Sequence, residues 1–261
     1  IARDAYGKKP LLYSVNNKEI SFASDLKSLE KIIPCGEINA EAVESLFRFR
    51  FIHDPLTIYK KVNKLPAGHL IEFDNSGCSV RKWYSLAIKE NLFNNKNEIC
   101  HNISILFDNA VKKRLVSDVP LGLLLSGGLD SSLILASLAK QEKKIPCFTM
   151  GFEGASDYYE ERPIAKKLAD YFGMEHIDLE ISPKNLVNIL PEVFNASDEP
   201  FADSSAIPTT LVSKMARKEV TVALSADAGD EVFAGYNRYD YLMRYGKKLN
   251  SLPGFARKSI A

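Results

Sequence analysis

The stretch LGLLLSGGLDSSLILASLAK, residues 121–140, decides the fold of this chain. An apolar run from Leu121 to Leu125 leads into a turn that contains Gly127 and Gly128, and an amphipathic stretch follows the turn. A strand, a tight turn and a helix in this order are typical of βαβ units on a parallel sheet. The sequence therefore predicts an α/β fold with an open, mostly parallel sheet.

The same alternation of apolar runs and amphipathic stretches continues through the second half of the chain. We expect strands at residues 121–125, 145–152, 176–181 and 220–225, and helices around 99–111, 131–141, 160–172, 186–194 and 206–218. In open parallel sheets, ligands bind beyond the carboxyl ends of the strands. The loops that open at Ser126, Gly151 and Ser225 should therefore converge on one crevice.

Residues 1–92 have a different, mostly β pattern. Two hairpins are predicted, with turns at Asn16-Asn17 and at Asn75-Ser76-Gly77, because short runs rich in Tyr, Ile, Phe and Leu flank these turns. The change of pattern near residue 92 indicates two domains, at 1–92 and at 93–261.

One helix is predicted between the two hairpins, over residues 40–49. Asn39 precedes this helix, and an Asn side chain at this position caps the N–H groups of the first turn. Val43, Leu46 and Phe47 fall on one face at helical spacing. The pattern therefore indicates a short amphipathic helix within the β-rich region.

The turn from Ser126 to Ser132 has the composition of an anion-binding loop. Its two glycines let the backbone bend tightly and present N–H groups, and the N-terminus of the next helix adds partial positive charge. Three serine hydroxyls supply further donors. The chain has neither the Gly-Lys-[Ser/Thr] of kinase-type P-loops nor the GxGxxG of dinucleotide sites. The alternative is a simple turn in which Asp130 caps the next helix.

Carboxylates gather after the last predicted strand, at Asp227, Asp230 and Glu231. Like charges at this spacing repel each other unless a metal or cationic groups offset them. One of them could also take a proton from an attacking amine. Asp130 needs a cation as well if a polyphosphate lies beside it, so we expect Mg²⁺ there. The alternative is that Asp230 and Glu231 only complement a helix dipole.

Composition argues against several classes of function. The formal net charge is +1, and no basic run exceeds Lys112-Lys113-Arg114, so nothing favours a nucleic-acid partner. The four cysteines show neither the paired spacing of zinc sites nor the density of a disulfide scaffold. No apolar run approaches the roughly 20 residues of a membrane span. We therefore expect a cytoplasmic protein without a membrane partner.

Several motifs together resemble a known enzyme family. LLLSGGLDSS, FTMGFEG, DEPFADSSAIPT and LSADAGDEVFAGYNRY look like the synthetase domain of asparagine synthetase and related glutamine-dependent amidotransferases. ARDAYGKKPLLY, ISFASDLKSL and KLPAGHLIEFD are similar to the end of that family's glutaminase domain. The resemblance covers nearly the entire chain. It implies a sheet of the PP-loop ATP pyrophosphatase (HUP-like) type, preceded by the C-terminal, β-rich part of an Ntn-type glutaminase domain.

The resemblance also implies roles for residues around the expected crevice. Asp227 falls where the family has an acidic residue near the acyl-adenylate, so it would transfer a proton or orient the amine. Asp130 and Asp230 would hold Mg²⁺ and complete the catalytic set. Pyrophosphate would be held by Ser126, Gly127, Gly128, Asp130, Ser131 and Ser132. The adenosine pocket would be lined by Leu124, Leu125 and Met150 and closed by the backbone of Ser225 and Ala226.

This chain departs from the family pattern at several points. The family commonly has glycine where this chain has Ala226 and Ala228, and alanine is tolerated there only if the backbone angles are ordinary. The family's glutaminase uses an N-terminal cysteine whose α-amine is the base, whereas residue 1 here is Ile. We therefore expect a fragment that lacks both ends and does not hydrolyse glutamine by itself. A loop with Asp198, Glu199, Asp203 and Ser204 would lie near the acceptor carboxylate.

The implied activity is that of an ATP-dependent ligase. Aspartate would be activated as an acyl-adenylate with release of pyrophosphate, and ammonia from glutamine would then attack it. One alternative is a relative that amidates another carboxylate, such as a surface-sugar acid, or closes a lactam. Others are a non-catalytic nucleotide-binding module and a tRNA-modifying PP-loop enzyme, which the absent basic surface disfavours. The sequence leaves the oligomeric state open, with a homodimer as one alternative.

Overall fold

The computed structural model of the chain describes residues 1–16, 19–88, 95–154, 160–182 and 186–254. It divides into two compact units, Ile1–Lys96 with Lys184–Thr210, and Asn97–Pro183 with Leu211–Ala261. The segment Lys184–Thr210 thus groups with the first unit, although the sequence suggests a single boundary near residue 92. The domain limits at 1–92 and 93–261 stay a prediction.

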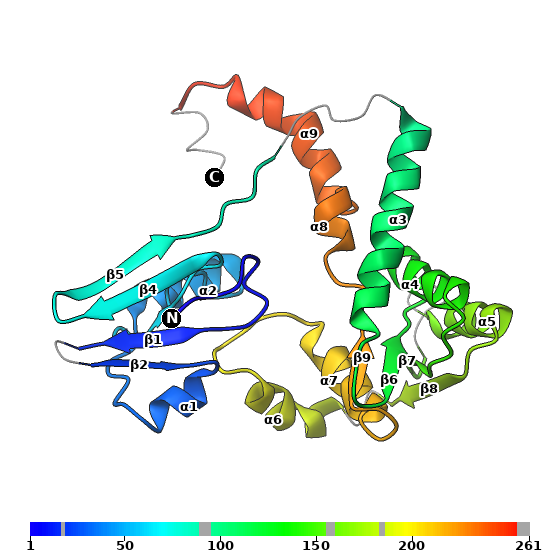
Figure 1. The fold of residues 1–261 in the computed structure, drawn as a ribbon, viewed down its shortest axis with the longest axis horizontal. Helices are drawn as coiled ribbons and strands as arrows, with labels where there is room; N and C mark the ends of the chain where they lie inside the picture. Colours follow the sequence, from blue (N-terminus) through cyan, green and yellow to red (C-terminus); the bar gives the residue numbers. More distant parts are fainter. Residues whose placement is uncertain (17–18, 89–94, 155–159, 183–185, 255–261) are drawn as a thin grey trace. The chain divides into compact units, whose positions relative to one another are not determined.

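The second unit is built on a parallel sheet with strand order β8-β7-β6-β9 (Figure 1). Its strands are β6 (Leu121–Leu124), β7 (Cys147–Phe152), β8 (His176–Ile181) and β9 (Val222–Leu224). Its helices are α3 (Lys96–Arg114), α4 (Leu129–Lys140), α5 (Arg162–Phe172), the end of α7 (Ala206–Ala216), α8 (Gly229–Phe233) and α9 (Asn237–Asn250). The open parallel α/β fold that the sequence predicts is confirmed.

Helices cover both faces of this sheet because side chains alternate along its strands. Leu123 and Cys147 pack in one core with apolar residues of α3, α4 and α5. Phe148, the next residue along β7, packs in the opposite core with Met215 and Ala216 of α7. Continuous apolar runs are what strands buried on both faces require. The run at residues 121–125 therefore predicted the central strand correctly.

The first unit contains two antiparallel sheets, β2-β1-β3 and β4-β5. Its elements are β1 (Leu12–Val15), β2 (Ile20–Ala23), α1 (Leu26–Glu30), α2 (Ala40–Phe49), β3 (Asn63–Lys64), β4 (His69–Asp74), β5 (Gly77–Lys82), α6 (Leu186–Ala196) and the start of α7. Strands β1 and β2 pair with Leu12 opposite Ala23, and β4 and β5 pair with His69 opposite Lys82. Both predicted strand pairs are confirmed, whereas residue 17 of the first turn lies outside the described residues.

Helix α2 begins and ends where the sequence predicts. The Asn39 side chain accepts a hydrogen bond from the Glu41 N–H at 3.1 Å, as expected for an N-cap. The predicted apolar face is wrong in part, because the buried residues are Ala42 and Ser45 while Phe47 is 84% exposed. The Ser45 hydroxyl turns inward because it donates to the Phe51 carbonyl at 3.1 Å.

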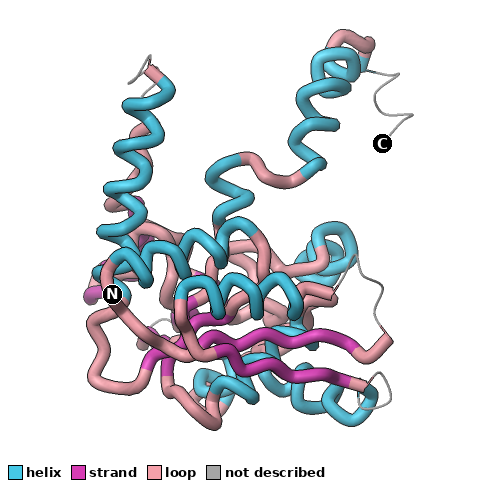
Figure 2. Tube along the Cα trace, turned by 90° about the vertical axis from the view of Figure 1, so that its right-hand side faces the viewer, coloured by secondary structure: helices cyan, strands magenta, loops and turns pink. Residues whose placement is uncertain are grey.

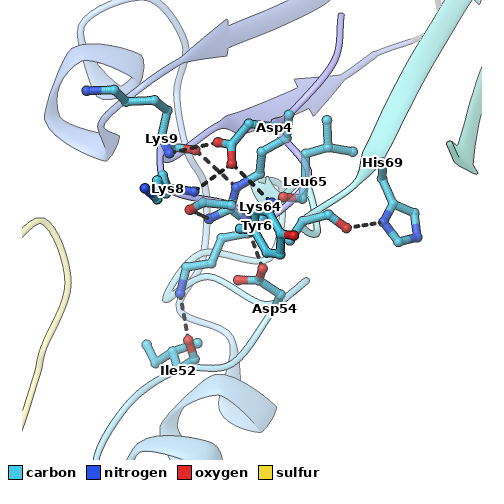
Figure 3. A network of polar contacts seen from close by, with 12 residues as sticks. Asp4, Tyr6, Lys8, Lys9, Ile52, Asp54, Lys64, Leu65 and His69 are labelled. Carbon is cyan, nitrogen blue, oxygen red and sulfur yellow. Dashed lines mark hydrogen bonds and ion pairs between the residues drawn. The ribbon is translucent and has the colours of Figure 1, made fainter. Parts of the chain in front are cut away.

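A polar network fixes the first turn of the chain (Figure 3). The Asp4 carboxylate accepts hydrogen bonds from the N–H groups of Tyr6, Lys8 and Lys9 at 3.0–3.1 Å. The Lys9 and Lys8 N–H bonds are the largest causes that lower the pKa of Asp4. The Arg3 guanidinium donates to the Leu65 carbonyl at 2.6 Å and pairs with Asp54 at 2.9 Å. This part of the ARDAYGKKP motif is therefore bound to Asp54 and to Leu65, the residue that follows β3.

Helix α9 lies apart from the sheet of its own unit in both views (Figures 1 and 2). Its apolar residues Leu242 and Met243 are 67% and 71% exposed. Of the helices in the described ranges, none combines the length and the apolar character that crossing a membrane requires.

Candidate active site

The site lies where the sheet order reverses. From β6 the chain adds β7 and β8 on one side, and it then returns to place β9 on the other side of β6. The carboxyl ends of β6 and β9 therefore flank a topological switch point, where open α/β sheets bind ligands. The glycine-rich loop follows β6, and the acidic loop follows β9.

The glycine-rich loop is held by hydrogen bonds among its own serines. The Ser131 side chain is buried, and its hydroxyl accepts from the Ser126 N–H at 3.2 Å and lies 3.0 Å from the Ser126 hydroxyl. The Ser132 hydroxyl donates to the Gly128 carbonyl at 2.6 Å. Ser131 and Ser132 thus stabilise the loop, whereas Ser126 is exposed and its hydroxyl also accepts a hydrogen bond from the Gly128 N–H at 3.3 Å.

Position 127 requires a glycine for two reasons. Its φ is +73°, a left-handed conformation that strains any residue with a side chain. A Cβ atom at this position would also lie 3.1 Å from the Glu161 carbonyl oxygen and 3.3 Å from the Ala165 nitrogen. The loop is therefore packed against the start of α5, and Gly128 caps α4 with an extended backbone. The loop has the shape that exposes backbone N–H groups at a helix N-terminus.

The acidic loop approaches the glycine-rich loop through Gly229. A Cβ atom at position 229 would overlap one carboxylate oxygen and the carboxyl carbon of Asp130. The half-buried Asp130 side chain therefore lies directly on the backbone of the second loop. The expectation that these two loops converge is confirmed by this contact.

The carboxylates of the acidic loop make hydrogen bonds and close contacts with residues nearby in the sequence. The exposed Ser225 hydroxyl donates to the Asp227 carboxylate. The Asp230 carboxylate lies on Gly235, where a Cβ atom would overlap one of its oxygens. The Tyr236 hydroxyl donates to Glu231 at 2.8 Å, and this bond is the first cause that raises the pKa of Tyr236. Asp230 and Glu231 also lie in the first turn of α8, as the helix-dipole alternative requires.

Ala228 does not have ordinary backbone angles. Its φ is +73°, in the left-handed region, and it caps α8. Ala226 is not among the residues with positive φ. The sequence-based condition for tolerating alanine is therefore met at Ala226 and not at Ala228, where the chain carries local strain.

The residues that are expected to line the adenosine pocket differ in how far they are buried. The Leu125 side chain is 1% exposed and packs in the core, so only its backbone can face a ligand. Leu124 and Met150 are half-buried, and Ala226 packs at the edge of the same core as Leu125. The adenosine contacts of Leu124, Met150, Ser225 and Ala226 stay a prediction.

The end of β7 is covered and does not open into a loop at Gly151. The strand continues to Phe152, and the Arg162 side chain lies on Gly151 so closely that a Cβ atom would overlap it. Arg162 is held by Glu160 at 2.6 Å and by Glu180 at 2.9 Å. The expectation that a loop opens at Gly151 is therefore wrong, because this position lies within β7 and is covered by the Arg162 side chain.

A donor set for Mg²⁺ can be judged from the residues present. Within the described residues, no group of three or more His, Cys, Asp and Glu side chains is arranged to hold a metal ion. Magnesium in nucleotide sites is usually bound by one or two carboxylates together with substrate phosphates. Asp130, lying against the residue that precedes Asp230, fits that second kind of site.

A hydrogen-bonded chain behind the glycine-rich loop was not predicted from the sequence. The Thr149 hydroxyl donates to the Leu125 carbonyl at 2.6 Å, so it accepts from Nε2 of His176 at 2.9 Å. The chain connects β8 through β7 to the residue before Ser126. In the sequence, the one signal for this chain of hydrogen bonds is Thr149, a polar, β-branched residue in an otherwise apolar strand.

The carboxylates of Asp198 and Glu199 are engaged within the first unit, and their expected place near the acceptor carboxylate stays a prediction. Both carboxylates accept hydrogen bonds from backbone N–H groups of the first unit, Asp198 from Leu26 at 2.9 Å and Glu199 from Ile58 at 2.6 Å. Glu199 also pairs with Lys64 at 2.5 Å. In the described structure, these two side chains are thus engaged with the β-rich region.

Comparison with known proteins agrees with this arrangement. Residues 102–261, more than half of the chain, match the family model described as asparagine synthase. The chain belongs to the asparagine synthase family. Residues 1–84 match the model of a glutamine amidotransferase domain. This asparagine synthase family chain therefore matches two family models, one in each half of its sequence. The PP-loop ATP pyrophosphatase type of its parallel sheet stays an expectation.

Curated relatives extend beyond this chain. It is 38% identical over 265 residues to a putative asparagine synthetase [glutamine-hydrolyzing] 2 of Methanocaldococcus jannaschii, covering 98% of this chain and 50% of the relative. It is 36% identical over 238 residues to asparagine synthetase [glutamine-hydrolyzing] 1 of Bacillus subtilis, covering 91% of this chain and 37% of the relative. The chain thus spans half or less of the length of these relatives.

Proposed function

We propose that the full-length protein forms asparagine from aspartate, glutamine and ATP, with AMP and pyrophosphate as the other products. The observation that supports this most directly is the contact between Asp130 and Gly229, which brings an anion-binding loop and an acidic loop together at the switch point of the sheet. Family membership and the names of the relatives support the choice of reaction.

In this proposal the glycine-rich loop binds the departing pyrophosphate. The Gly127 N–H and the N-terminus of α4 would face its oxygens, together with the Ser126 hydroxyl, which itself accepts from the Gly128 N–H at 3.3 Å. Asp130 and Asp230 would hold Mg²⁺, whose positive charge would offset the negative charge of the pyrophosphate. The hydrogen bonds that Ser131 and Ser132 make within the loop would keep these donors in place before ATP binds.

Asp227 would act on the second step. The aspartate carboxylate first attacks the α-phosphorus of ATP, which gives an acyl-adenylate and pyrophosphate. Ammonia then attacks the acyl carbon, and AMP leaves. The exposed Asp227 carboxylate, held by the Ser225 hydroxyl, would take the proton that the attacking amine loses.

The region at 1–84 would take part in supplying ammonia. Its match to a glutamine amidotransferase domain supports glutamine as the nitrogen donor of the full-length protein. Because ATP and glutamine are metabolites of the cytoplasm, we place the reaction there. ATP, aspartate and glutamine are the substrates that this function needs, with Mg²⁺ beside the nucleotide.

Product analysis of the full-length protein tests this function. With ATP, Mg²⁺, aspartate and ammonium, AMP, pyrophosphate and asparagine should accumulate in equal amounts. A parallel incubation with sugar acids in place of aspartate should give no pyrophosphate. Release of ADP and phosphate would refute the adenylation, and pyrophosphate release with a sugar acid alone would reassign the acceptor.

A further inference from the structure

Five contacts bind the segment Asn195–Asp203 to the β-rich region of the first unit. Its side-chain anchors are Asp198, at 2.9 Å from the Leu26 N–H, and Glu199, at 2.6 Å from the Ile58 N–H and 2.5 Å from Lys64. The Ala202 N–H donates to the Arg50 carbonyl at 2.9 Å, and Lys27 donates to the Asn195 carbonyl. The segment belongs to the part of the chain that matches asparagine synthase, and all five partners lie in the amidotransferase match.

Both side chains of the ion pair between Glu199 and Lys64 are largely shielded from water. The side chains of Glu199 and Lys64 are 13% and 20% exposed. Lys64 also donates to the Ile52 carbonyl at 2.7 Å (Figure 3), so the ammonium group has two partners. Removing one charge of such a pair leaves the other buried and uncompensated, which is far more disruptive than removing an exposed pair. The pair is therefore a specific attachment point.

The Asp198 carboxylate accepts a hydrogen bond from an N–H group at the N-terminus of helix α1. Leu26 is the first residue of α1, where N–H groups have no partner within the helix. Asp25, the N-cap residue, accepts from Ser28, and the Asp198 carboxylate accepts from Leu26. A carboxylate at this end also complements the helix dipole. Two adjacent acidic residues of one segment thus bind two separate backbone positions of the β-rich region.

In the sequence, the segment is followed by the elements that lead to the candidate active site. It is followed by α7 (Ala206–Ala216), then by β9 (Val222–Leu224), and then by the acidic loop that contains Asp227 and Asp230. A shift of Asp198 and Glu199 can therefore be passed along the chain to the start of β9. We propose that Asp198 and Glu199 couple glutamine hydrolysis to amide formation by fixing this segment on the amidotransferase region. This inference rests on the proposed function, since it needs both reactions.

The test measures the ratio of glutamate released to asparagine formed by the full-length protein. With glutamine, aspartate and ATP, the wild type should release about one glutamate per asparagine, as the proposed stoichiometry requires. Asp198→Ala should raise this ratio several-fold, because ammonia is then released without being used. Synthesis from added ammonium should stay within about twofold of wild type, since the partners of the two carboxylates are Leu26, Ile58 and Lys64. Glu199→Gln should raise the ratio further, because it discharges the shielded pair.

A matched control is Glu37→Gln, which removes an ion pair of the same region with Lys60. Its side chains are 82% and 55% exposed, so the ratio should not change. Asp198→Ala is the decisive variant, because Asp198 is exposed and its loss removes one helix-terminal hydrogen bond. A wild-type ratio in Asp198→Ala overturns the inference, even if thermal stability falls. If the wild type makes no asparagine from ammonium either, the proposed function itself fails.

Discussion

The Asp130 carboxylate lies on the backbone of Gly229, although the two residues are far apart in the sequence. They follow β6 and β9, which are hydrogen-bonded neighbours in register from Leu121 opposite Val222 to Leu123 opposite Leu224. The contact therefore follows from the topology of the sheet. It brings the first carboxylate of the glycine-rich loop to the loop that carries Asp227 and Asp230.

Gly229→Ala should displace Asp130 and impair the reaction. The new methyl group would overlap the carboxylate, while the backbone at 229 has no positive φ that would strain alanine. We expect pyrophosphate release by the full-length protein to fall on the order of 100-fold, as for other misplaced catalytic groups. The free energy of unfolding should change by less than about 1 kcal/mol.

Gly246→Ala is the matched control for this variant. A Cβ atom at 246 would lie 3.8 Å from the nearest Leu242 side-chain atom, which is ordinary contact distance. Helix α9 should tolerate or gain from the change, and the rate of pyrophosphate release should be that of the wild type. Equal rates in Gly229→Ala and Gly246→Ala would show that the position of Asp130 is unimportant.

Ala228→Gly should stabilise the protein. A left-handed alanine costs about 1–2 kcal/mol, whereas glycine adopts this conformation freely but gains entropy in the unfolded chain. We expect a net gain of about 0.5–1 kcal/mol in the free energy of unfolding, measured by urea denaturation. Ala226→Gly, where φ is not positive, should instead destabilise by a similar amount. The idea of local strain at 228 is wrong if both variants destabilise equally.

His176 should make the stability of the protein depend on pH. Burial is the largest influence on this imidazole and lowers its pKa, Asp178 and Asp170 raise it, and Lys166 lowers it. Because Nε2 donates to Thr149, protonation would add a proton to Nδ1, which is buried without a hydrogen-bond partner. The unfolded chain binds this proton more readily than the folded one. Stability should therefore be full above about pH 6.5, the ordinary His pKa, and decrease as the pH falls below it.

His176→Gln provides the comparison. The glutamine amide can donate to Thr149 as Nε2 does, but it does not titrate. The change in urea midpoint between pH 7.5 and pH 5.5 should be smaller in this variant than in the wild type. An equal change in both proteins would assign the pH dependence to other groups.

Much of this fold follows from local signals in the sequence. The run at 121–125 predicted β6 because a strand covered on both faces needs apolar residues on both sides. Asn39 predicted the start of α2 because a side-chain acceptor at that position is required by the helix itself. The convergence of the loops at Ser126 and Ser225 followed from the general rule for parallel sheets.

Other features depend on partners that the sequence does not name. Phe47 has helical spacing with Val43, yet which face is buried depends on what packs against it. Asp198 and Glu199 accept hydrogen bonds from the N–H groups of Leu26 and Ile58, partners that no motif in the sequence indicates. The left-handed angle of Ala228 is likewise invisible in composition, because alanine gives no signal for it.

The most direct test of the central claim is pyrophosphate release by the full-length protein with Asp130→Ala, at saturating ATP, Mg²⁺ and aspartate. Asp118→Ala is the control, since Asp118 is exposed and precedes β6 at its opposite end. If Asp130 holds the cation of the departing pyrophosphate, its loss should slow release on the order of 100-fold or more, while the control stays at the wild-type rate. A rate within about twofold of wild type in Asp130→Ala would contradict the account.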